Sequence, residues 1–103
     1  MDSYRPLFLS ESRRRLGMIR AHLSNHDIQG TRDCFHALRG MSGVMRFHPI
    51  TQLAAAAEEG DLSGGQAEEA LELMEQQVLQ VEAGVSIVEA TDLIRRLQSG
   101  GRG

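Results

Sequence analysis

The sequence predicts an all-α protein, an antiparallel up-and-down four-helix bundle followed by either a fifth helix or a kink. Apolar side chains recur every three or four residues in successive segments, a period typical of helices with one buried face. The connections between these segments are short, which favours antiparallel neighbours. The 103 residues include one tyrosine, three phenylalanines and no tryptophan, so aliphatic helix packing is favoured over an aromatic-rich β core. This length suits one domain with one core.

The first helix is expected from about Ser3 to Leu23. Ser3 is a competent N-cap, and Pro6 is tolerated in a first helical turn. The stripe expected to be buried comprises Phe8, Ser12, Leu16, Ile19 and Leu23. The arginines at 13–15 lie mostly off this stripe and are expected to face solvent.

The second helix should begin after the polar break at 24–27, where Asp27 can cap it, and should run from about Ile28 to Phe47. Its buried face is predicted to carry Phe35, Leu38, Ser42 and Met45. His48-Pro49 should end this helix, because a proline biases the preceding residue away from helical geometry. Pro49 is then well placed to begin a third helix that reaches Glu59 and buries Ile50, Leu53 and Ala57.

The glycine-rich segment 60–65 is the clearest loop, and a fourth helix should follow to at least Ala83. Its predicted stripe comprises Ala67, Leu71, Met74, Val78, Val81, Val85 and Val88. Near Gly84 the stripe shifts to Ile87, Ile94 and Leu97, which leaves open a fifth helix or a kink. We expect residues 1–98 to form the domain and 99–103 a flexible tail or the start of a linker.

His36 lies off the buried face of the second helix, about 100° round from Phe35. It shares a stripe with Arg39, Gly40 and Gly43. A glycine inside a helix costs about 1 kcal/mol relative to alanine, so two on one stripe need a reason. We interpret that reason as access, because bare backbone lets another macromolecule approach the imidazole closely. Arg39 would supply a positive charge beside it.

The segment His36-Ala37-Leu38-Arg39-Gly40-Met41-Ser42-Gly43 resembles the His-x-Leu/Ile-Lys/Arg-Gly-x-Ala/Ser-Gly signature of histidine phosphotransfer (HPt) domains. The most similar version is that of the N-terminal phosphotransfer domain of chemotaxis histidine kinases (CheA-type). Phe8-Leu9-Ser10-Glu11-Ser12 also resembles the Phe-x-x-Glu-Ala/Ser pattern that opens that domain. The resemblance implies that His36 accepts a phosphoryl group and passes it to an aspartate of a response-regulator receiver domain.

The resemblance also assigns roles to other residues. An ungapped count from His36 places Glu58 where the family has a glutamate that hydrogen-bonds the imidazole, although a plain surface residue is an equal alternative. Arg39 would offset phosphate charge. Gly40 and Gly43 would admit the partner, and nearby apolar side chains of the first two helices would form a docking patch.

Two departures from the family pattern affect the chemotaxis subclass more than phosphotransfer itself. Arg46-Phe47 stands where a further glycine often precedes the aromatic residue, which could change how the second helix ends. Ala55 replaces a histidine often found one turn before the glutamate. His48 is a competing acceptor, but it lacks the following Arg-Gly and is better interpreted as a helix-end histidine near solvent.

Partners must supply the rest of the chemistry. The chain has no glycine-rich nucleotide loop with its lysine and no cluster of acidic metal ligands, so we expect no cofactor and no metal of its own. The implied partners are the ATP-binding domain of a histidine kinase and a receiver domain. The net charge of −3 argues against nucleic acid or an anionic membrane as partner. A lone cysteine and the lack of a signal-peptide pattern point to the cytoplasm.

Two other function classes compete with phosphotransfer. One is a non-catalytic interaction bundle with a degenerate phosphotransfer fold, in which His36 is only a surface histidine. The other is a metal-binding bundle that uses His22, His26, His36 or His48. The sequence leaves open whether the chain is complete or a piece of a longer kinase, what its oligomeric state is, and which kinase, regulator and stimulus it serves.

Overall fold

The computed structural model describes residues 4–99, which form five helices. These are α1 (Arg5–Ser24), α2 (Ile28–Val44), α3 (His48–Glu59), α4 (Gln66–Ala83) and α5 (Thr91–Ser99). Residues 4–99 contain no strand, so the predicted all-α class is confirmed. Within that range, no helix has both the length and the apolar character needed to cross a membrane.

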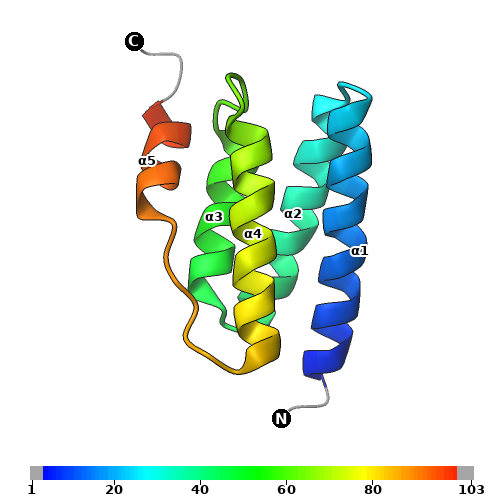
Figure 1. The fold of residues 1–103 in the computed structure, drawn as a ribbon, viewed down its shortest axis with the longest axis vertical. Helices are drawn as coiled ribbons and strands as arrows, with labels where there is room; N and C mark the ends of the chain where they lie inside the picture. The colour runs from blue at the N-terminus through cyan, green and yellow to red at the C-terminus, as the bar shows by residue number, and fades with distance from the viewer. Residues whose placement is uncertain (1–3, 100–103) are drawn as a thin grey trace.

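The first four helices lie side by side, with α5 outside them (Figure 1). Each helix of this group packs against two others: α2 against α1 and α3, and α4 against α1 and α3. The α1–α2 and α3–α4 loops lie at one end, and the α2–α3 loop lies at the other. α5 packs against α3 and α4. The core therefore lies between the four long helices and extends beneath α5.

The buried side chains follow the predicted stripes closely. Almost all stripe residues of the four helices are buried: Phe8, Ser12, Leu16, Ile19, Phe35, Leu38, Ser42, Ile50, Leu53, Ala57, Ala67, Leu71, Met74, Val78 and Val81. Leu23 and Met45 are only partly buried. Arg13 and Arg14 are exposed as predicted, whereas Arg15 is half-buried because it turns towards Cys34 of α2.

The α1–α2 connection is a tight turn. Pro6 lies in the first turn of α1 as expected, and the predicted cap Ser3 lies outside the described residues. α1 ends at Ser24, and His26 adopts a left-handed conformation (φ 57°). Asp27 caps α2 as predicted, since its carboxylate accepts a hydrogen bond from the Gly30 N–H at 2.9 Å.

The predicted end of α2 at Phe47 is wrong, because the helix stops at Val44. Arg46 adopts a left-handed conformation (φ 61°), and the Phe47 N–H reaches back to the Ser42 carbonyl at 2.9 Å. A left-handed residue followed by such a backward hydrogen bond is a common way to end a helix. Arg46-Phe47 therefore reverses the chain before Pro49 enters the first turn of α3.

A separate fifth helix, rather than a kink, follows α4. Gly84 ends α4 in the left-handed region (φ 74°), and residues 85–90 are non-helical until α5 begins. The predicted burial of Val85 and Val88 is therefore wrong, and both are exposed. Leu93 and Leu97 bury one face of α5. α5 includes Ser99, where the tail was expected to start, and residues 100–103 of that predicted tail lie outside the described residues.

Candidate functional site

His36 stands on the outer face of α2, and its side chain is 71% exposed. Its neighbours Phe35 and Leu38 are fully buried and fix the rotation of the helix. Because residues on a helix are about 100° apart, burial of these two side chains turns the imidazole outwards. The core thus presents His36 to solvent.

Glu58 of α3 contacts the imidazole, with 2.8 Å between Nδ1 of His36 and Oε2 of Glu58. α2 and α3 pack closely along their length, and Ser42 and Thr51 share a hydroxyl hydrogen bond of 2.7 Å between them. This packing brings together two residues that are 22 positions apart in the sequence. The side chain of Glu58 is 22% exposed, so the carboxylate is partly shielded by the bundle.

The surroundings of Glu58 keep its carboxyl ionised. Burial alone would raise its pKa, but the hydrogen bonds from His36 and Arg39 outweigh burial, and the pKa is lower than its ordinary value. An ionised carboxylate can only accept hydrogen bonds, so the proton of the neutral imidazole lies on Nδ1. The lone pair of Nε2 is then free for a nucleophilic or basic role.

Arg39 belongs to the same network. Its guanidinium donates to Oε1 of Glu58 at 3.1 Å and to Oε2 of Glu59 at 3.3 Å. The hydrogen bonds that it donates to Glu58 and Glu59 raise the pKa of Arg39. Glu58 is thus bonded through both carboxylate oxygens, one to His36 and the other to Arg39. The positive charge lies one helical turn from the imidazole, on the side that faces α3.

Gly40 and Gly43 extend the stripe of His36 as exposed backbone. A Cβ atom placed on either glycine would meet no atom of the described chain within 4 Å, apart from the helix's own nearby backbone. Internal packing in this region therefore does not require glycine at either position. Gly43 lies in the last turn of α2, but Gly40 lies inside the helix, and its cost of about 1 kcal/mol is unexplained by the fold, which favours a contact with another molecule.

An apolar surface lies between α1 and α2 near the last turn of the helix that carries His36. Three of its side chains, Tyr4, Leu7 and Val44, are exposed by 63%, 60% and 82%. Together with Phe8, Glu11, Met41 and Met45 they line a groove whose exposed surface is apolar. An exposed apolar cluster of this kind is typical of a protein interaction surface. The sequence predicted a patch on these two helices without naming its residues.

Arg32 is a site residue that the sequence did not single out. It lies on α2 four residues before His36, and its guanidinium donates to the carbonyl oxygens of Glu58 at 2.7 Å and Gly60 at 3.0 Å. Its spacing from His36 and Arg39 was the only signal in the sequence. A bond from a side chain to a distant main-chain carbonyl leaves no pattern that marks the acceptor.

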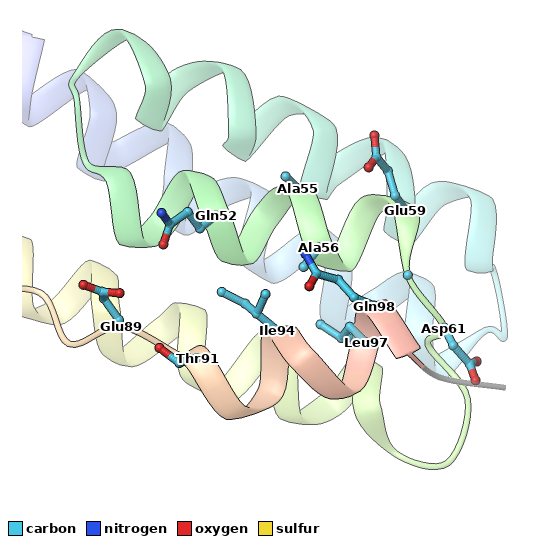
Figure 2. Close-up of a pocket in the computed structure, with 11 residues that line it drawn as sticks. Gln52, Ala55, Ala56, Glu59, Asp61, Glu89, Thr91, Ile94, Leu97 and Gln98 are labelled. Atoms are coloured by element: carbon cyan, nitrogen blue, oxygen red, sulfur yellow. The ribbon is translucent and has the colours of Figure 1, made fainter. Parts of the chain in front are cut away.

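The other histidines lie apart from this network. His22 Nδ1 is 3.1 Å from the Asp27 carboxylate, and His26 lies in the turn between α1 and α2. His48 is an exposed residue at the start of α3. Figure 2 shows a second hollow, between α3 and α5, with Ala55, Ile94 and Leu97 on its walls. Its carboxylates are Glu59, Asp61 and Glu89.

An all-helical bundle that presents an exposed, carboxylate-bonded histidine beside bare glycines has the features of a phosphoacceptor domain. The family model of the Hpt domain matches residues 3–99, nearly the whole chain, and the chain belongs to this family. Membership implies histidine phosphotransfer in phosphorelay signalling, in which Hpt domains work with kinases and receiver domains. No curated protein and no solved structure matches the chain.

Proposed function

We propose that this chain is the phosphotransfer module of a chemotaxis-like two-component pathway. His36 accepts a phosphoryl group from the ATP-binding domain of a histidine kinase and passes it to the aspartate of a receiver domain. The observation that carries this proposal is the 2.8 Å contact between Nδ1 of His36 and the ionised Glu58, which leaves Nε2 as the nucleophile. The chemotaxis-like context rests on the resemblance of the segments 8–12 and 36–43.

In the first step, the Nε2 lone pair attacks the γ-phosphorus of ATP. A nitrogen–phosphorus bond forms as the bond from phosphorus to the bridging oxygen breaks, and ADP leaves with the electron pair. The imidazole gains positive charge, which the Glu58 carboxylate offsets through the Nδ1–H group. In the second step an aspartate oxygen attacks the phosphorus, and the electron pair returns to Nε2.

The remaining residues admit the partner and offset the negative charge of the phosphoryl group. Arg39 lies close enough to the site to offset the charge of the phosphoryl group, and its bonds to Glu58 and Glu59 hold it there beforehand. The bare stripe at Gly40 and Gly43 admits the partner's active site, which brings its own magnesium. The apolar groove between α1 and α2 is the docking patch for that partner.

The scaffold in this proposal is an up-and-down antiparallel four-helix bundle within residues 1–98, with α5 as an added helix, in the cytoplasm. Loops at alternating ends of the molecule support this topology (Figure 1). α5 contributes buried leucines to the same core, so we include it in the domain.

Intact-mass measurement after incubation with ATP, magnesium and candidate kinase domains tests the proposal. We expect the mass of one acid-labile phosphate, absent in His36→Gln and retained in His48→Gln. Phosphate that persists in His36→Gln would refute the assignment of the acceptor. If His36→Gln leaves partner signalling intact, the non-catalytic interaction bundle becomes the better explanation.

A further inference from the structure

Glu58 lies near the end of its helix, as the second-last residue of α3. The last carbonyl groups of a helix have no partners within the helix, so its final turn unwinds easily. Gly60 follows in an extended conformation (φ −89°, ψ −173°), which is not the left-handed cap that closes many helices. The last turn of α3, all within the described residues, also carries no basic side chain.

Arg32 of α2 supplies the basic side chain that the last turn of α3 lacks. Its guanidinium donates to the carbonyl oxygens of Glu58 and Gly60, at the end of α3 where the helix dipole is negative. A charged donor makes these bonds stronger than bonds between neutral groups. The guanidinium is partly buried, which shields the bonds from competing water.

The two arginines of this stripe hold Glu58 at different atoms. Arg32 binds its main-chain carbonyl, and Arg39 binds Oε1 of its side chain. His36 lies between the two arginines on α2, and its Nδ1–H donates to the remaining oxygen, Oε2. The position of the carboxylate relative to Nδ1 is therefore set by bonds to the backbone as well as to the side chain.

The same turn is held from its other side by α5. The Asp61 N–H donates to the Leu97 carbonyl at 3.1 Å, and a Cβ on Gly60 would lie 2.8 Å from that same oxygen. The chain after α3 thus passes between α5 and Arg32, so close to α5 that Gly60 has no space for a side chain. Without Arg32, no charged side chain of α2 would bind the carbonyl oxygens of Glu58 and Gly60.

We propose that Arg32 is a positioning residue for phosphotransfer: it fixes the last turn of α3 so that Glu58 holds His36 with its proton on Nδ1. The effect of Arg32 on the rate of phosphotransfer rests on the proposed function of His36. Its effect on the imidazole tautomer does not. Arg32 itself touches neither phosphate nor imidazole in this role.

Nitrogen-15 NMR of the imidazole tests the structural half in the full chain. The wild type should show His36 mainly as the Nδ1–H tautomer, and Arg32→Gln should shift it towards Nε2–H. Arg32→Lys should restore part of the wild-type signal. Arg96→Gln is the matched control, because Arg96 forms a surface pair with Glu69 at 3.0 Å, away from Glu58, and it should leave the tautomer unchanged.

Phosphorylation by phosphoramidate, which needs no kinase partner, tests the chemical half. Arg32→Gln loses the charge-assisted hydrogen bonds to two carbonyl oxygens, and we expect it to react about three- to tenfold more slowly, because only part of this loss reaches the Glu58 carboxylate. In a Glu58→Ala background the same substitution should have no further effect, because there is no carboxylate left to position.

A wild-type tautomer and rate in Arg32→Gln would overturn the proposal, and so would an equal slowing with and without Glu58. If the tautomer shifts but His36 is never phosphorylated, the positioning role stands and the proposed function fails. The two failures are therefore distinguishable.

Discussion

Replacement of Gly40 with alanine should stabilise the fold and impair transfer to a partner at the same time. Gly40 is exposed within α2, and an added Cβ would touch no other part of the described chain within 4 Å. Only helix propensity then changes, which favours alanine by about 1 kcal/mol. For a domain of this size, that gain corresponds to a rise of about 4–8 °C in Tm.

The added methyl group would also stand where the partner's active site must close over His36. We expect transfer between the partner and His36 to slow by about tenfold or more, because a displacement of about 1 Å in the reacting atoms can cost about a hundredfold in rate. Gly40→Leu should block transfer almost completely. Reaction with phosphoramidate, a small donor, should continue at the wild-type rate in both variants.

Gly17→Ala is the matched control. Gly17 is an exposed mid-helix residue of α1, and an added Cβ would likewise meet no atom of the described chain within 4 Å beyond its own helix. It should raise Tm by a similar amount and leave transfer unchanged. Thermal unfolding by circular dichroism and labelled-phosphate transfer measure the two effects. Normal transfer through Gly40→Ala and Gly40→Leu would refute the assignment of these glycines to partner access.

Three further predictions concern stability. Arg46→Gly should raise the free energy of unfolding in urea by about 1 kcal/mol, because the left-handed backbone at φ 61° suits glycine better than arginine; an unchanged midpoint would contradict this. Leu97→Ala should lower the same quantity by about 2–5 kcal/mol, since the side chain is 1% exposed, and a loss below about 1 kcal/mol would mean that α5 is not part of the core. The pKa of Glu58 is lower in the folded state than its ordinary value of 4.5, so its contribution to stability is present above that value and is lost as the pH falls through the lowered pKa. The stability of Glu58→Gln should lack this dependence on acid pH. If the wild type and Glu58→Gln lose stability identically as the pH falls, the bonds of Glu58 to His36 and Arg39 do not cause it.

Periodic burial explains why most of the fold could be predicted from the sequence. Each long helix keeps one apolar stripe, and a stripe with a period of 3.6 residues is visible without any knowledge of the neighbours. The stripe predicted burial wrongly beyond the end of α4. Val85 and Val88 continue the apolar period of α4, but Gly84 turns the chain in the left-handed region before them.

The end of α2 could not be predicted, because it depends on a conformation that the residue type disfavours. Arginine at position 46 gives no sign of a left-handed backbone, whereas glycine would have done so. Pro49 was a clear signal, but it marks the first turn of α3 rather than the last turn of α2. The three residues between Val44 and His48 form the reversal itself.

Within the site, the sequence indicated residues whose types and spacing carry chemistry. His36, Arg39 and Glu58 were singled out in this way, and the structure brings all three into one hydrogen-bonded network. Their chemical roles stay predictions until phosphorylation is measured. Arg32 was missed because its acceptors are main-chain carbonyls of α3, and any sequence supplies such carbonyls.

The location of the site decides how its variants should be interpreted. The side chains of His36 and Glu59 are both 71% exposed, and that of Arg39 is 43% exposed. Ion pairs in such positions contribute about 0–1 kcal/mol to stability. The free energy of folding comes instead from the buried stripes on the opposite faces of the same helices. Loss of phosphorylation in His36→Gln or Arg39→Gln would therefore report on chemistry and not on unfolding. The unfolding transition of each variant should stay close to that of the wild type.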